Sequence, residues 1–90
     1  MSSDENLYNI ILSPFSSERI FELIESQNKI AFIVNRKANK TTIRKAIEKL
    51  YNVKVIKINV MMSSKGKKKV IVKLDPTNSA VDLATALGLM

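Results

Sequence analysis

Ninety residues suffice for one small domain, and a composition of 46% apolar and 26% charged residues is globular rather than disordered. The absence of cysteine and histidine excludes disulfides, thiolate or imidazole metal sites, and Ser-His or Cys-His catalysis. With two glycines, Gly66 and Gly88, there is no glycine-rich phosphate loop. We therefore expect no enzyme, no metal, no cofactor and no small-molecule substrate.

The net charge of +7 is distributed unevenly along the chain. Residues 1–35 hold five acidic and two basic side chains, a net charge of −3. Residues 36–90 hold thirteen basic and three acidic ones, a net charge of +10. Such an imbalance predicts one face for a polyanion and another face kept away from it.

The hydropathy pattern predicts neither a membrane-spanning helix nor a secretory signal. No apolar run approaches the roughly 18 residues of a membrane-spanning helix. Residues 1–6 are polar and acidic, unlike a secretory signal, and we expect them to be a disordered start. The sequence thus predicts a cytoplasmic protein without a membrane span.

The first elements in chain order are a strand and an acidic helix. Residues 7–12 form a short apolar run that Ser13 and Pro14 should end, as expected of a strand. Ser16 or Ser17 can cap the helix that follows, whose apolar residues recur at helical spacing. Its solvated side carries three acids, Glu18, Glu22 and Glu25.

A second strand and a basic helix follow. The continuous apolar run over residues 30–34 predicts a central strand with both faces covered. The next loop, residues 35–40, carries Arg36, Lys37 and Lys40. Apolar residues from Ile43 to Leu50 then keep helical register, with Arg44, Lys45 and Lys49 on the outer face.

The last part of the chain predicts a hairpin and a short helix. In a strand over residues 53–62, alternation places Ile56, Ile58, Val60 and Met62 on one face, with Lys57 and Asn59 on the other. The loop 63–68, which contains Gly66, leads into a strand over residues 69–75. Ser79 and Asp82 resemble a capping box, and Gly88 should end the helix that begins there.

The order β-α-β-α-β-β-α, without a repeat or linker, predicts one α+β domain over residues 1–90. We expect a four-stranded, largely antiparallel sheet packed with helices. One face of this sheet should meet a polar partner rather than a helix, because Lys57 and Asn59 lie in a strand of high β-propensity.

Basic side chains on the loop, the second helix, the third strand and the hairpin together predict RNA binding. A single lysine cluster is usually a solvated face, but a run of like charge at the hairpin repels itself unless something anionic lies opposite. Aromatic residues are few, so we expect folded RNA recognised by backbone and shape, although charge alone does not exclude DNA. The predicted RNA-binding residues are Arg36, Lys37, Lys40, Arg44, Lys45, Lys57, Asn59, Lys65, Lys67, Lys68, Lys69 and Lys73.

Four segments, in this order, resemble the L23 family of large-subunit ribosomal proteins. Residues 11–14 followed by 16–19 resemble its opening strand and first helix, and residues 42–55 its second helix and the entry to the third strand. Residues 57–60 and 68–74 resemble its last two strands. The resemblance covers about residues 9–90, and the short hairpin loop is similar to that of the archaeal and eukaryotic branch. Val70 and Asp75 depart from the usual pattern.

The resemblance implies a ribosomal structural protein that binds large-subunit ribosomal RNA beside the polypeptide exit tunnel and contacts neighbouring ribosomal proteins. It also implies a docking platform for signal recognition particle or other nascent-chain factors. Glu18 falls at the family position associated with chaperone docking, and Glu22 and Glu25 share its helix face.

Two other interpretations remain open at this point. A free-standing, chromatin-type nucleic-acid-binding protein is also consistent with a pI of 9.9. A small acyl-phosphate hydrolase using Arg36 and an asparagine is the enzymatic alternative, and it lacks a glycine-rich anion loop.

Overall fold

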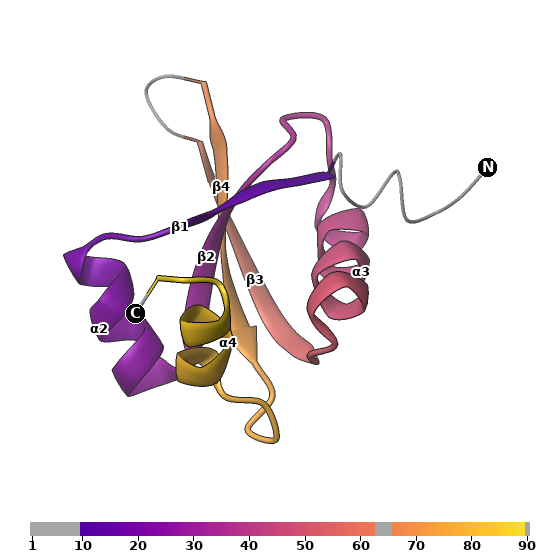
Figure 1. The fold of residues 1–90 in the computed structure, drawn as a ribbon. Helices are drawn as coiled ribbons and strands as arrows, with labels where there is room; N and C mark the ends of the chain where they lie inside the picture. Colours follow the sequence, from indigo (N-terminus) through magenta and orange to yellow (C-terminus); the bar gives the residue numbers. More distant parts are fainter. Residues whose placement is uncertain (1–9, 63–65, 90) are drawn as a thin grey trace.

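The computed structural model describes residues 10–62 and 66–89 (Figure 1). The elements, in chain order, are β1 (Ile11–Phe15), α2 (Glu18–Gln27), β2 (Lys29–Val34), α3 (Lys40–Tyr51), β3 (Val55–Met62), β4 (Lys68–Leu74) and α4 (Ala80–Ala86). The predicted α+β class and the order β-α-β-α-β-β-α are confirmed.

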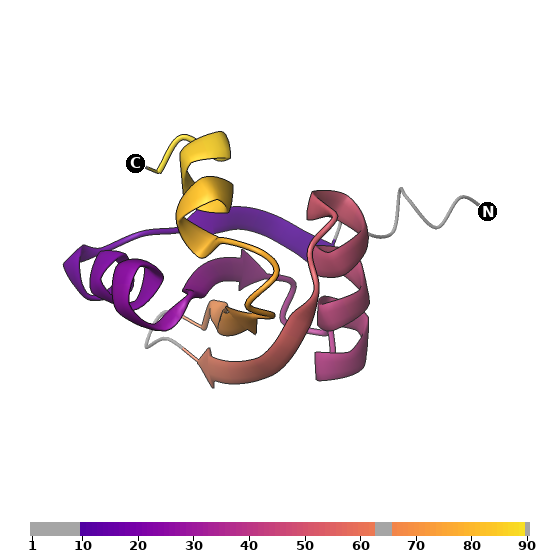
Figure 2. The ribbon, with the colours of Figure 1, turned by 90° about the horizontal axis from the view of Figure 1, so that it is seen from below.

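The sheet has the strand order β1-β2-β4-β3, and every neighbouring pair is antiparallel. Viewed from below, α4 lies on one side of the sheet and α2 and α3 flank it, and none of the described helices lies on the opposite side of β3 and β4 (Figure 2). We call the side toward α4 the helix face and the opposite side the open face. The open face is where a polar partner was expected.

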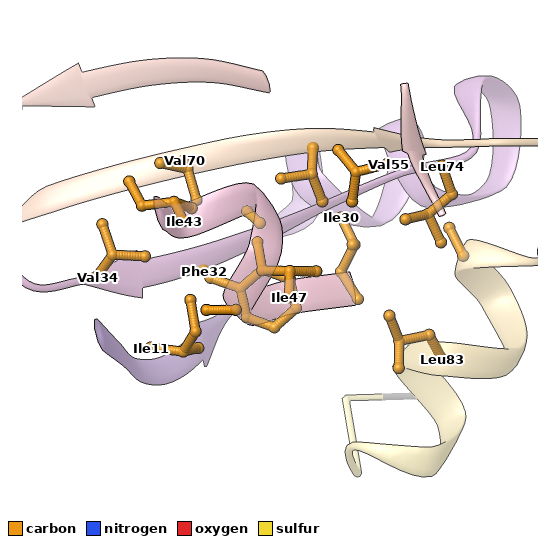
Figure 3. Packing of buried hydrophobic residues seen from close by; sticks show 14 of the residues in the cluster. Ile11, Ile30, Phe32, Val34, Ile43, Ile47, Val55, Val70, Leu74 and Leu83 are labelled. Carbon is orange, nitrogen blue, oxygen red and sulfur yellow. The ribbon is translucent and has the colours of Figure 1, made fainter. Parts of the chain in front are cut away.

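The hydrophobic core lies between the helix face and the helices. Phe32 of β2 is fully buried (Figure 3). Its ring stacks on Tyr51 of α3, with the ring centroids 5.3 Å apart. Ile43 and Ile47 of α3 are also fully buried against this face. The helical periodicity of the sequence therefore identified the buried sides of the helices correctly.

Side chains at the helix ends explain where each helix begins. Ser17 caps α2, Asn39 caps α3 and Ser79 caps α4, each accepting a hydrogen bond from the backbone N–H three residues later. The caps predicted at Ser17 and Ser79 are confirmed. Lys40, expected in a loop, is instead the first residue of α3, because Asn39 is the cap.

Three strand predictions need correction. Pro14 lies inside β1 rather than after it. An edge strand such as β1 tolerates proline, because the N–H that proline lacks would face away from the sheet. Residues 7–9 of the predicted strand lie outside the described residues. A register shift between Val55 and Lys57 buries Val55 and leaves Ile56 48% exposed, so Ile56 does not belong to the apolar face. β2 was expected to be covered on both faces, but its open face is covered only in part, since Ala31 is buried there and Ile33 is just half-buried.

Candidate nucleic-acid interface

The open face is built by the strand register, because residues paired across neighbouring strands point to the same side of a sheet. Lys57, Asn59 and Met61 of β3 are exposed there. They alternate with Ile58 and Val60, which are half-buried and point to the helix face. The prediction that Lys57 and Asn59 share a side distinct from the apolar one is therefore confirmed.

Three lysines form a row across this face. Lys57 of β3 pairs with Lys73 of β4, and Lys73 in turn pairs with Lys29 of β2. Like charges directly opposite one another on neighbouring strands repel and destabilise a sheet. Among the described residues, none of the three forms an ion pair with a carboxylate. The row is thus a concentration of positive charge that an anion could neutralise, and we call it the lysine row.

Lys29 was missed from the sequence because it belongs to the acidic half of the chain. Its place is fixed by the pairing of β2 with β4, and this pairing depends on a strand order that the sequence does not reveal. The alternation of β2 gave no signal for it, because residues 30–34 are all apolar and Ala31, on the same face as Lys29, is buried.

The remainder of the open face is more apolar. The next row contains Asn59, Ile71, Ala31 and Phe15, and the row beyond it contains Met61, Lys69, Ile33 and Ser13. The Lys69 ammonium lies 4.3 Å from the centroid of the Phe15 ring, a cation–π contact. Lys69 therefore holds a positive charge beside an aromatic surface on the same face as the lysine row.

Two basic segments that were predicted separately meet at one end of the sheet. Arg36 and Lys37, from the loop after β2, line an open groove of about 760 Å³ together with Gly66 and Lys67 from the hairpin. Its floor is apolar and includes Leu12 and Ile33. The loop and the hairpin thus present their charge together; Lys65 lies outside the described residues.

The basic side of α3 reaches the edge of β3. Lys40 and Arg44 line a smaller groove of about 200 Å³ that also contains Lys57. Arg44 forms an ion pair of 3.8 Å with Glu48, whose carboxylate also accepts a hydrogen bond from the N–H of Val55. Lys45 is exposed on the same helix. This arrangement brings Lys40 and Arg44, but not the whole outer side of α3, to the lysine row.

Lys68 differs from the other lysines of the hairpin. Its pairing with Val34 and Met62 directs it to the helix face, and it is half-buried. Its ammonium donates a hydrogen bond to the carbonyl of Ala38, in the loop before α3. Lys68 therefore fixes this loop, and the structure gives it a stabilising role in addition to its charge.

The acidic residues of α2 lie on another element than these basic clusters. Glu18, Glu22 and Glu25 are all exposed on α2, as the sequence predicted. Elsewhere, hydrogen bonds from the backbone and hydroxyl of Thr77 hold the pKa of Asp75 below its ordinary value of 3.8. The acidic face of α2 and the lysine row thus belong to different elements.

Over residues 10–62 and 66–89, no group of three or more acidic side chains could hold a metal ion. Within the same ranges, no helix is both long and apolar enough to cross a bilayer.

This chain is similar to known proteins over most of its length. The family model for ribosomal protein L23 matches residues 9–80. Large ribosomal subunit proteins uL23B and uL23A of Schizosaccharomyces pombe are each 42% identical over 83 residues, which is 92% of this chain and 59% of theirs. Large ribosomal subunit protein uL23 of Trypanosoma brucei brucei is 40% identical over 83 residues, again 92% of this chain and 51% of its own length. The chain thus spans little more than half the length of these relatives. It belongs to the ribosomal protein L23 family.

Proposed function

We propose that this chain is a structural component of the large ribosomal subunit that binds ribosomal RNA through its open sheet face. The observation that carries the proposal is the lysine row, in which Lys29, Lys57 and Lys73 lie side by side without a carboxylate partner among the described residues. Phosphates of folded RNA would neutralise this row and position the protein on the RNA backbone. The chain would then act as a component of cytoplasmic ribosomes.

The groove near Arg36 and Lys67 extends this surface to the end of the sheet. Together with Lys40 and Arg44 beside Lys57, it gives a basic surface that continues around two sides of the sheet. A surface of this extent suits double-helical RNA, which proteins recognise mostly by shape and by backbone contacts.

The position beside the polypeptide exit tunnel and a docking role for α2 are proposals that rest on the family resemblance. Glu18, Glu22 and Glu25 are exposed and belong to a helix outside the basic surface, so they could meet signal recognition particle or another nascent-chain factor while RNA is bound. Neighbouring ribosomal proteins would contact the remaining surface.

Neutralising single lysines tests the RNA-binding face. Changing Lys29, Lys57 or Lys73 to Gln should weaken binding to large-subunit ribosomal RNA and reduce the slope of log affinity against log salt by about one per lost phosphate contact. Lys54→Gln is the matched control, because Lys54 is an exposed lysine between α3 and β3 and outside the lysine row.

Two results would contradict the proposal. One is an equal loss of RNA affinity in Lys54→Gln and in the lysine-row variants. The other is loss of affinity on changing Glu22 and Glu25 to Gln while the lysine variants bind normally. Equal affinity for duplex DNA and ribosomal RNA would favour a free-standing nucleic-acid-binding protein, and sedimentation of the endogenous protein apart from the large subunit would support the same alternative.

A further inference from the structure

A small hollow lies on the open face next to the start of α2. It has a volume of about 240 Å³, and apolar side chains from five elements line it, namely Phe15, Ile20, Ala31, Met61 and Ile71. Ala31 explains the hollow, because its methyl group stands between Ile71 and Phe15, its paired neighbours on either side. A larger residue at this central position would fill the space.

Two cations lie at the same hollow. Lys69 lines it and rests against the Phe15 ring, and Arg19 lines it from the first turn of α2. Neither Arg19 nor Lys69 forms an ion pair with another described residue. The hollow therefore combines a flat aromatic surface, an apolar floor and unneutralised positive charge within one small volume.

An unpaired nucleotide combines the complementary features, since its base is flat and apolar on both sides and its phosphate is anionic. Proteins that bind unpaired bases commonly stack them on aromatic side chains and place arginine or lysine near the backbone. The hollow shares its face with the lysine row, so RNA held there would lie across it. An apolar protein side chain could also enter, but it would leave both cations without an anion.

We propose that this hollow receives one unpaired base of the bound RNA, stacked against Phe15, with Lys69 and Arg19 on the adjoining phosphates. This inference rests on the proposed RNA-binding function and adds to it a single base contact. The open face would then recognise a helical RNA that carries a bulged or flipped nucleotide rather than any duplex.

The test uses a short RNA duplex and the same duplex with one bulged 2-aminopurine nucleotide. The wild-type chain should bind the bulged RNA about tenfold more tightly, as expected for one stacked base. The fluorescence of the bulged 2-aminopurine should fall on binding because the base becomes stacked. Phe15→Leu should abolish both effects while leaving affinity for the paired duplex unchanged.

Two further variants separate this inference from the proposed function. Ala31→Val fills the hollow and keeps the ring, so it should remove the preference for the bulge without weakening duplex binding. Lys57→Gln should weaken binding to both RNAs and keep the preference. Circular dichroism and thermal unfolding would confirm that each variant is folded.

Failure of this inference can be told apart from failure of the proposed RNA-binding function. Equal affinity of the wild-type chain for both RNAs, or a preference that survives Phe15→Leu and Ala31→Val, would overturn the inference; the hollow would then be free for a protein side chain. In that case, weaker binding by Lys57→Gln would still support the proposed function. Binding of neither RNA would contradict both.

Discussion

Asn28 joins three elements and is the position where a single substitution should be most informative about stability. It ends α2 in the left-handed conformation, with φ of 55°. Its amide nitrogen lies 2.9 Å from the carbonyl oxygen of Asn78 and 3.2 Å from that of Leu74. Its amide oxygen accepts a hydrogen bond of 2.7 Å from the N–H of Ala80, the first residue of α4. One side chain therefore ties the end of α2 to the end of β4 and the start of α4.

Asn28→Gly removes these three hydrogen bonds while keeping a residue that adopts positive φ freely. At about 1 kcal/mol of net stability for each bond, the variant should lose roughly 2–3 kcal/mol, since glycine relieves part of the backbone strain. For a domain of this size, each kcal/mol shifts the Tm by about 4–8 °C. We expect thermal unfolding by circular dichroism to show a fall of about 10 °C or more.

Asn52 provides the matched control. It ends α3 with nearly the same conformation, φ of 53°, and its exposed side chain has no hydrogen bond in the described structure. Asn52→Gly should therefore change the Tm little. Equal shifts for Asn28→Gly and Asn52→Gly would refute the reasoning, because the side-chain bonds of Asn28 would then contribute nothing.

Three further perturbations test other parts of the structure. Phe32→Leu removes the stacking on Tyr51 and leaves a small cavity, which should cost about 1–3 kcal/mol and lower the urea midpoint without changing the m-value; an unchanged midpoint would argue against this packing. Lys68→Met should lower the Tm more than Lys69→Met does, because the Lys68 ammonium donates a hydrogen bond to the carbonyl of Ala38 in the loop before α3. Equal Tm shifts for the two variants would contradict that role. Because the pKa of Asp75 is lowered in the folded chain, its contribution to stability is present above pH 3.8 and is lost as pH falls further. The wild-type chain should therefore lose its Tm advantage over Asp75→Ala as the pH falls below about 3.8, and a constant advantage would be inconsistent with the lowered pKa.

Local signals predicted the elements well. The Ser17 and Ser79 caps, the apolar stripe of α3 and the left-handed Gly88 after α4 all depend on residues within a few positions of one another. Such short-range chemistry is visible in sequence because the interacting groups are neighbours in the chain. The same reason explains the correct separation of Lys57 and Asn59 from the apolar face.

Signals that depend on distant pairing were not predictable. The register shift that exposes Ile56 arises from the pairing of β3 with β4, and a one-residue shift reverses the side of every neighbour. The lysine row requires the order β2-β4-β3, so Lys29 could not be assigned before the sheet was known. Lys68 was grouped with the RNA-binding lysines, although its half-buried contact with Ala38 emerges only from the packing of a loop thirty residues away.

The most direct test of the central claim is the reactivity of individual lysines toward an acylating reagent, compared between the free chain and isolated large ribosomal subunits. If the open face binds ribosomal RNA, Lys29, Lys57 and Lys73 should react in the free chain and become protected in the subunit. Equal reactivity of the lysine row in both states, or absence of the chain from the subunit, would contradict the account.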